Sequence, residues 1–128
     1  VTRVPLIMRT PAHKPGVSSS IVELVDLFPT ACELAGLPVP QSVEGTSLLP
    51  ILKDPKASVK KSALSFVNRG TSMRSSDWSY MKYKDGSEEL YDMKKDPRQF
   101  ENLAKSPQHA DIMKKLRVQF GKRTQGLP

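Results

Sequence analysis

The residues from 88 to 104 constrain the fold more than any other part of the sequence. They contain a short predicted strand, Glu89–Met93, which Asp96-Pro97 ends, and then a polar turn that leads to the apolar pair Leu103-Ala104. A segment rich in Tyr and Trp precedes this stretch, and an amphipathic helical pattern follows it. This order predicts an α+β architecture, in which a small antiparallel sheet packs against a C-terminal helix.

Alternating side chains predict the other strands of this sheet. Residues 63–67 and 72–75 favour strands, and residues 68–71 between them favour a turn. Residues 78–83 predict a further strand, in which Trp78, Tyr80 and Lys82 share one face because successive side chains of a strand point to opposite faces. Residues 84–87 predict a hairpin turn in which Gly86 is free to adopt a positive φ.

The last helix is predicted from its start and from its apolar stripe. Ser106 is a favoured helix cap, and Pro107 suits the first helical position because the backbone N–H that it lacks has no partner there. Apolar side chains at helical spacing then predict the face that packs on the sheet. These side chains are Ile112, Leu116 and Phe120, with Met113 and Val118 at the flank of the stripe.

The first helix of the chain is predicted near the middle of an apolar segment. With Asp26 as its N-cap, Pro29 falls in the first turn, where no helical hydrogen bond is lost, and Gly36 ends the helix in a left-handed conformation. A start at Ser20, with Glu23 completing a capping box, would leave Pro29 in the helix interior. The Asp26 start is therefore preferred.

Two further elements are predicted in the N-terminal part. The apolar run Val4–Met8 predicts a buried strand, although Pro5 has no N–H to donate to a neighbouring strand. Ser47 is a candidate cap for a short helix with Pro50 in its first turn. The intervening residues 37–45 are rich in turn formers and predict a connector.

Composition narrows the class of protein. The net charge is +7, which suits acidic partners, but the basic residues occur in scattered pairs that a solvated surface explains. The single cysteine, Cys32, rules out an internal disulfide and lies in an apolar helical pattern, so we expect it to be buried. No apolar run approaches the roughly 18 residues that cross a bilayer.

Several blocks of the sequence resemble, in the same order, the C-terminal third of type I sulfatases of the alkaline-phosphatase-like superfamily. Each block alone is a weak match, but the order of the blocks along the chain makes the resemblance specific. The form of residues 22–30 is most similar to the iduronate-2-sulfatase branch. The blocks are TRVPLIMR (2–9), VELVDLFPT (22–30), LAGL (34–37), EGTSLLPIL (44–52), SMRSSDWSY (72–80), ELYD (89–92), DP (96–97) and NLA (102–104).

The resemblance implies an enzyme whose catalytic centre lies elsewhere. Sulfatases use a formylglycine made within a Cys- or Ser-x-Pro-x-Arg motif, and a calcium ion held by Asp and Asn or His side chains. Cys32 is followed by Glu33 and Leu34, so it does not fit that motif. We therefore expect no catalytic and no metal-binding residue in this chain, and expect calcium and formylglycine only in a longer parent protein.

The candidate site residues are Asn68 and Arg69. They lie in a loop at the edge of the predicted sheet, and a guanidinium suits bidentate contact with a sulfate or carboxylate. Arg74 is expected to form a structural salt bridge at a domain seam. We expect the two histidines, His13 and His109, to be exposed. The aromatic residues Trp78, Tyr80, Tyr83 and Tyr91 are expected to pack within the sheet rather than to stack on bases.

The resemblance also predicts organisation and partners. Residues 1–55 would end an α/β sulfatase core, and residues 56–128 would form a C-terminal subdomain. The parent would hydrolyse sulfate esters of sulfated sugars, in the periplasm, the lysosome or outside the cell, with no nucleic acid or membrane as partner. This segment would be a scaffold against the upstream catalytic domain. Alone, it is expected to self-associate or to be disordered over roughly its first 40 residues.

Two other functions remain open from the sequence. One is a stand-alone basic module that binds polyanions, whose affinity would fall steeply with salt concentration. The other is the tail of a related phosphodiesterase, which only an upstream nucleophile would distinguish. A degenerate, inactive homologue would share the same fold.

Overall fold

A computed structural model describes residues 4–127. The chain forms two compact units that join between Ala63 and Leu64, and each is described by itself. No helix in the described range is long and apolar enough to cross a membrane.

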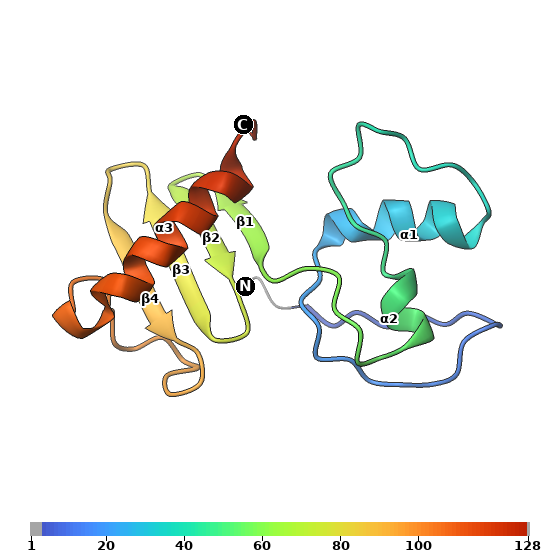
Figure 1. Cartoon of the computed structure of the whole chain (residues 1–128), viewed down its shortest axis with the longest axis horizontal. Helices are drawn as coiled ribbons and strands as arrows, with labels where there is room; N and C mark the ends of the chain where they lie inside the picture. Colours follow the sequence, from blue (N-terminus) through green and yellow to red (C-terminus); the bar gives the residue numbers. More distant parts are fainter. Residues whose placement is uncertain (1–3, 128) are drawn as a thin grey trace. The chain divides into compact units, whose positions relative to one another are not determined.

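The first unit contains short helices and long connections (Figure 1). A 3₁₀ turn, η1 (Leu24–Asp26), leads directly into α1 (Leu27–Leu34), and α2 (Leu49–Lys53) follows a connector. The strand predicted at Val4–Met8 is wrong, because residues 4–10 have no regular structure. A strand needs a neighbour for its backbone N–H and C=O groups, and the described part of this unit contains no strand beside it.

Helix α1 begins and ends where the sequence predicted. Fully buried Pro29 is its third residue. Asp26 directly precedes its first residue, but it does not cap the helix as expected: its backbone is already helical because η1 precedes α1, and its side chain makes no capping hydrogen bond. The helix ends with Gly36 at φ +69°, and the Leu37 N–H donates to the Cys32 carbonyl oxygen at 2.9 Å. Cys32 itself is only half-buried, so the expectation of a buried thiol is wrong: the side of α1 that carries it is not fully covered.

The second unit is built on a four-stranded antiparallel sheet with the order β1-β2-β3-β4. The strands are β1 (Ala63–Val67), β2 (Gly70–Arg74), β3 (Trp78–Tyr83) and β4 (Glu88–Asp92). Strand β2 begins two residues earlier than predicted, so the turn is shorter than 68–71. At Gly70 the backbone lies so close to β3 that an added Cβ would be 2.5 Å from the Lys82 carbonyl oxygen. Glycine therefore permits this pairing. Gly86 has φ +85°, as the predicted hairpin requires.

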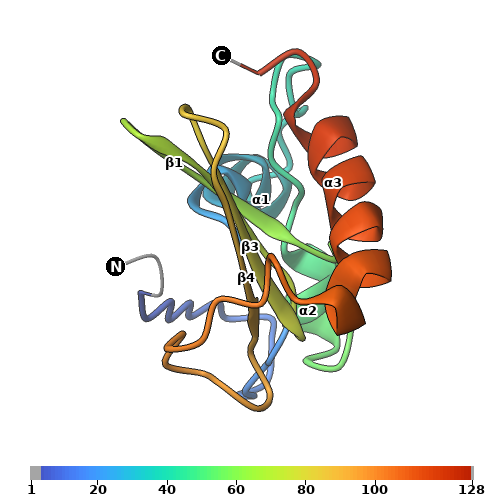
Figure 2. The same ribbon diagram turned by 90° about the vertical axis from the view of Figure 1, so that its left-hand side faces the viewer.

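The core of the second unit lies between the sheet and α3 (Ala110–Thr124), which follows the 3₁₀ turn η2 (Pro107–His109). Figure 2 shows α3 against one face of the sheet. Met73, Tyr80 and Leu90 occupy successive cross-strand positions and so share that face. Val118 is 56% exposed, so its predicted place at the flank of the stripe is wrong: it lies on the opposite side of the helix. The helical side chains of the buried cluster are Met113, Leu116 and Phe120.

Candidate functional site

The predicted site residues lie at one end of the sheet. Asn68 and Arg69 are the exposed two-residue link between β1 and β2. The Lys84 N–H donates to the Arg69 carbonyl oxygen at 2.9 Å, so this link lies beside the β3–β4 hairpin. In that hairpin the Ser87 hydroxyl, by hydrogen bonding to the Asp85 carboxylate, lowers the pKa of Asp85. The sheet end therefore presents two cations, Arg69 and Lys84, and the amide of Asn68.

A buried ion cluster in the first unit was not predicted from the sequence. The Lys60 Nζ lies 2.6 Å from both Glu23 Oε2 and Asp26 Oδ1. The three side chains are 8%, 12% and 0% exposed, respectively. Asp26 also accepts hydrogen bonds from the backbone N–H groups of Glu23 and Thr46. The carboxylate of Asp26 is thus held by protein donors, which fits a structural tie rather than a group that exchanges protons with a substrate.

The same cluster fixes the connector that follows α1. The Thr30 hydroxyl donates to the Asp26 carbonyl oxygen and accepts from the Leu48 N–H at 2.8 Å. Gly45 lies against the backbone of Val25, where an added Cβ would be 2.0 Å from the carbonyl oxygen. Two of the sequence blocks, residues 22–30 and 44–52, are therefore held together by polar contacts. The signal in the sequence was Glu23 and Asp26 at helical spacing, but a partner 34 residues away from Asp26 has no local signature.

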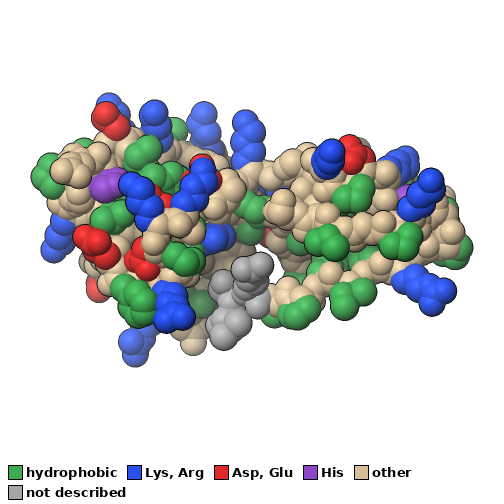
Figure 3. Space-filling model, turned by 90° about the horizontal axis from the view of Figure 1, so that it is seen from below, with side chains coloured by type: hydrophobic (Ala, Val, Ile, Leu, Met, Phe, Trp, Pro, Cys, Tyr) green, Lys and Arg blue, Asp and Glu red, His purple; other side chains and the backbone are tan. Residues whose placement is uncertain are grey.

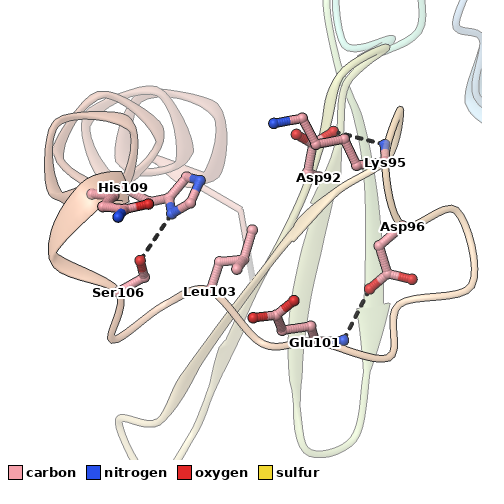
Figure 4. A pocket seen from close by; sticks show the side chains of 8 residues that line it. Asp92, Lys95, Asp96, Glu101, Leu103, Ser106 and His109 are labelled. Atoms are coloured by element: carbon pink, nitrogen blue, oxygen red, sulfur yellow. Dashed lines mark hydrogen bonds between the residues drawn. The ribbon is translucent and has the colours of Figure 1, made fainter.

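A small hollow of about 260 Å³ lies where the β4–η2 connection meets the start of the last helix (Figure 4). Its acidic side chains already accept hydrogen bonds from the connection itself. Asp92 Oδ1 accepts from the Lys95 N–H, and Asp96 Oδ2 accepts from the Glu101 N–H at 2.9 Å. His109 Nδ1 lies 3.0 Å from the Ser106 Oγ. These bonds stabilise the connection.

The two histidines differ from the exposed positions predicted for them. His109 is half-buried, and its ring meets the edge of Trp78 with the centroids 5.9 Å apart. His13 is half-buried as well, and its Nδ1 lies 2.7 Å from the Thr10 hydroxyl. Both rings therefore have local structural partners. Of the aromatic residues, Tyr80 is fully buried and Tyr91 nearly so, which confirms their packing role.

A charged triad links α3 to the sheet. The Arg117 guanidinium donates through Nε to Glu88 Oε1 at 2.9 Å, and the Tyr80 hydroxyl donates to the same carboxylate. The Arg117 hydrogen bond is the largest cause that lowers the pKa of Glu88, whereas burial, and then Glu88, raise the pKa of Tyr80. The triad holds the helix in register on the sheet.

The calcium ion and formylglycine that the sulfatase resemblance implies can be compared with the described residues. No group of three or more His, Cys, Asp or Glu side chains converges in a way that could hold a metal ion, within the range that the structure covers. Cys32 lies in α1 and is followed by Glu33, so it offers no precursor for a formylglycine. Calcium and formylglycine therefore do not fit on this part of the protein, and no reaction step is assigned to its residues.

The sequence of the chain is similar to those of known sulfatases. Delta 4,5-hexuronate-2-O-sulfatase of Bacteroides thetaiotaomicron is 37% identical over 134 residues, covering 92% of this chain and 27% of the relative. Human arylsulfatase K is 35% identical over 118 residues, covering 79% of this chain and 22% of the relative. The chain thus spans about a quarter of the length of these proteins.

The structure of the chain is also similar to solved structures of sulfatases. The solved structure of a 2-O GAG sulfatase superposes with a TM-score of 0.68 at 34% identity, covering 78% of this chain and 24% of that one. The resemblance to sulfatases is confirmed, and the antiparallel sheet with its helices matches the C-terminal part of sulfatase structures. Residues 1–125 match the family described as N-sulphoglucosamine sulphohydrolase, C-terminal. The chain belongs to this family of sulfatase C-terminal domains.

Proposed function

We propose that this chain is the C-terminal part of a sulfatase that hydrolyses sulfate esters of sulfated sugars, and that the segment itself is a scaffold. The match of residues 1–125 to a sulfatase C-terminal family supports this proposal. The relatives named above include enzymes for hexuronate 2-O-sulfate and glycosaminoglycan 2-O-sulfate. The same similarity supports an iduronate-2-sulfatase-like substrate class, because iduronate is a hexuronate that can carry a sulfate at O2 like the Delta 4,5-hexuronate named for the relative.

The scaffold role is supported by one observation: the apolar side chains on one side of η1 and α1 are exposed to solvent. Leu24, Val25 and Phe28 are 69%, 51% and 56% exposed, although they lie in one of the blocks shared with sulfatases. Apolar surface of this kind is stabilised by burial against another apolar surface. The upstream catalytic domain of the same protein is the proposed cover, and residues 1–55 would complete its α/β core.

The second unit would contribute one wall of the substrate pocket. Asn68 and Arg69 are exposed at the end of the sheet, and within the described residues neither side chain has a hydrogen bond or an ion pair. An exposed arginine whose guanidinium has no protein partner is suited to bind a sulfate or carboxylate of the sugar. Calcium and formylglycine would belong to the upstream part, where they would activate the sulfate ester.

The test is to read the parent gene upstream of Val1 and to assay the longer protein. A Cys- or Ser-x-Pro-x-Arg motif with hydrolysis of a uronate 2-O-sulfate, lost when residues 1–128 are deleted, is the expected result. Hydrolysis of phosphodiesters instead would support the related phosphodiesterase. A start codon directly before Val1, with polyanion binding by this chain alone, would overturn the proposal.

The site assignment has its own test. Arg69→Ala is expected to raise KM for the sulfated sugar about tenfold, because one charge-assisted bidentate contact is lost, while kcat changes little. Lys56→Ala, an exposed cation of the first unit, is the matched control. Equal KM values for both variants would remove Arg69 from the pocket wall.

A further inference from the structure

The outward face of α3 is a basic strip that the proposed function does not use. Lys114, Lys115 and Lys122 are exposed on it, with Val118 between them. In Figure 3, Lys and Arg side chains stand along one margin of the unit that contains the sheet. We define these three lysines and Val118 as the α3 strip. Its position opposite the buried stripe of the helix keeps it away from the core of the unit.

The charge of the strip is not neutralised by its surroundings. Among the described residues, none of the three lysines has an ion pair or a hydrogen bond, in contrast to Arg117, whose guanidinium is paired with Glu88. Asp111, in the first turn of α3, is the one acidic residue of the helix. An excess of positive charge therefore remains along the outward face, and it attracts anions from solution.

The spacing of the lysines suits an extended anion rather than a single small one. Lys115 and Lys122 are two helical turns apart on the same side, which separates their Cα atoms by about 10 Å along the axis. Lys114 lies on the other side of Val118. A shallow hollow between them is lined by Asp111, Lys114, Lys115 and Val118. A polymer with repeated anionic groups can reach these cations at once, and the valine offers an apolar contact to a sugar ring.

The strip is expected to stay in water in a longer protein as well. Covering three unpaired ammonium groups with another domain would carry a desolvation cost that no described carboxylate offsets. The apolar side of α1 has the opposite character and is the surface that an upstream domain would cover. The three lysines therefore remain available for a partner in solution.

We propose that the α3 strip is an accessory binding surface for a sulfated polysaccharide chain, which holds the polymeric substrate outside the catalytic pocket. This inference rests on the proposed function for the choice of a sulfated sugar polymer. Two observations favour this partner over single-stranded nucleic acid. The outward face of α3 carries no aromatic side chain on which bases could stack, and Trp78 is half-buried against His109. Lysine, a point charge on a flexible stem, adapts to sulfates at variable spacing.

The experiment uses the full-length protein that contains this chain, with the triple variant Lys114→Glu, Lys115→Glu and Lys122→Glu. Its matched control is Lys14→Glu, Lys53→Glu and Lys56→Glu, which makes the same charge change at exposed positions of the first unit. Affinity for size-defined heparin is measured across salt concentrations. Hydrolysis is measured on a sulfated polymer and on a monosaccharide sulfate. Circular dichroism and Tm verify that both variants are folded.

The strip variant is expected to bind heparin about tenfold or more weakly, with a shallower dependence on salt, because three cations no longer displace counterions. Its KM for the polymer should rise, while kcat/KM for the monosaccharide sulfate stays as in the unaltered protein. The control should retain heparin affinity. Unchanged heparin binding in the strip variant, or an equal loss in the control, would overturn the proposal.

Two further outcomes separate this inference from the proposed function. If a DNA duplex of equal charge competes as well as heparin, the strip is a general polyanion surface and its assignment to sulfated glycans is wrong. If the protein hydrolyses no sulfate ester but loses heparin binding with the three lysines, the proposed function fails; the strip then remains a polysaccharide-binding surface, and its role in holding a substrate is wrong. Loss of monosaccharide hydrolysis in the strip variant would contradict a role outside the pocket.

Discussion

Different kinds of buried side chain stabilise the interior of each of the two units. In the first unit the fully buried side chains are chiefly polar or small, such as Asp26, Thr30 and Pro29. In the second unit an apolar cluster fills the space between sheet and helix. The first unit instead leaves its large apolar side chains exposed, Phe28 among them. Both units belong to one family, yet within residues 4–127 the buried apolar cluster lies in the second unit alone.

This difference shows which unit can be stable without a partner. Burial of apolar surface is the dominant favourable term in folding, whereas buried ion clusters contribute little net stability because desolvation offsets their attraction. The contacts around Asp26 specify how the first unit is arranged, and the contacts around Tyr80 supply the stability of the second. The first unit is therefore the one that we expect to depend on further protein.

The largest expected effect comes from separating the units. A piece covering residues 62–128, which retains the whole of β1, should unfold in one cooperative transition, because it contains the complete apolar cluster. A piece covering residues 1–61 should show no such transition. Urea unfolding followed by circular dichroism measures both. A cooperative transition in the N-terminal piece, with slow amide exchange at Val4–Met8, would contradict the comparison.

The next effect tests the core directly. Leu90→Ala should lower the free energy of unfolding of the second unit by about 3–4 kcal/mol, because a fully buried side chain is removed between Tyr80 and α3. Chemical denaturation of the 62–128 piece gives this value. Val118→Ala is the matched control, since Val118 is exposed, and it should change the free energy by less than about 0.5 kcal/mol. Similar losses in both variants would mean that the packed side of α3 is assigned incorrectly.

The parts of this core that could be predicted are those with a short-range sequence pattern. Period-two alternation identified the face of β3 that carries Tyr80, and helical spacing identified Leu116 and Phe120. The pattern could not exclude Val118, because an isolated valine between two polar side chains, Arg117 and Gln119, fits either side of a helix. The start of β2 was missed because Gly70 has low strand propensity, and its close approach to β3 appears only in three dimensions.

The first unit was less predictable for a different reason. The helix start directly after Asp26 and its end at Gly36 are local signals, and both positions were correct. The pairing of Lys60 with Glu23 and Asp26 joins residues far apart in sequence, which no periodicity reveals. Of the candidate site, the exposed turn at Asn68 and Arg69 was predicted, but its proximity to the substrate remains a prediction, as do the domain limits 1–55 and 56–128 and the seam role of Arg74.

A third effect concerns the polar tie of the first unit. Lys60→Met should destabilise the local structure by about 2–3 kcal/mol, because two buried carboxylates lose their cation. Amide hydrogen exchange at Thr46, whose N–H donates to Asp26, reports this loss. Lys61→Met changes the exposed neighbouring lysine and should leave the exchange rate unchanged. Slow exchange at Thr46 in Lys60→Met would show that the ion cluster is dispensable.

A fourth, smaller effect is a pH dependence of the second unit. The pKa of Glu88 is lowered chiefly by Arg117, so the contribution of this carboxylate is present above its unfolded pKa of roughly 4.3 and is lost as pH falls through the folded value. Because Arg117 is half-exposed, the contribution is about 1 kcal/mol. Glu88→Gln should cost that amount at pH 7 and flatten the stability of the 62–128 piece between pH 5 and 3 (about 2 pH units across the titration). An unchanged acid slope would assign the dependence to other carboxylates.

The smallest effect expected in the isolated chain is that of a substitution at the exposed Phe28, and it tests most directly whether the first unit needs a covering partner. Phe28→Ser should change amide protection in the isolated 128-residue chain by less than about 0.5 kcal/mol, because the ring is more than half exposed. In a longer protein that covers α1, the same change should lower the free energy of unfolding by about 2 kcal/mol, since the ring would then be buried. Amide hydrogen exchange in α1 of the 128-residue chain gives the first value, and chemical denaturation of the longer protein gives the second. A small effect in both would mean that α1 faces water in the whole protein, and the first unit would then need a different source of stability.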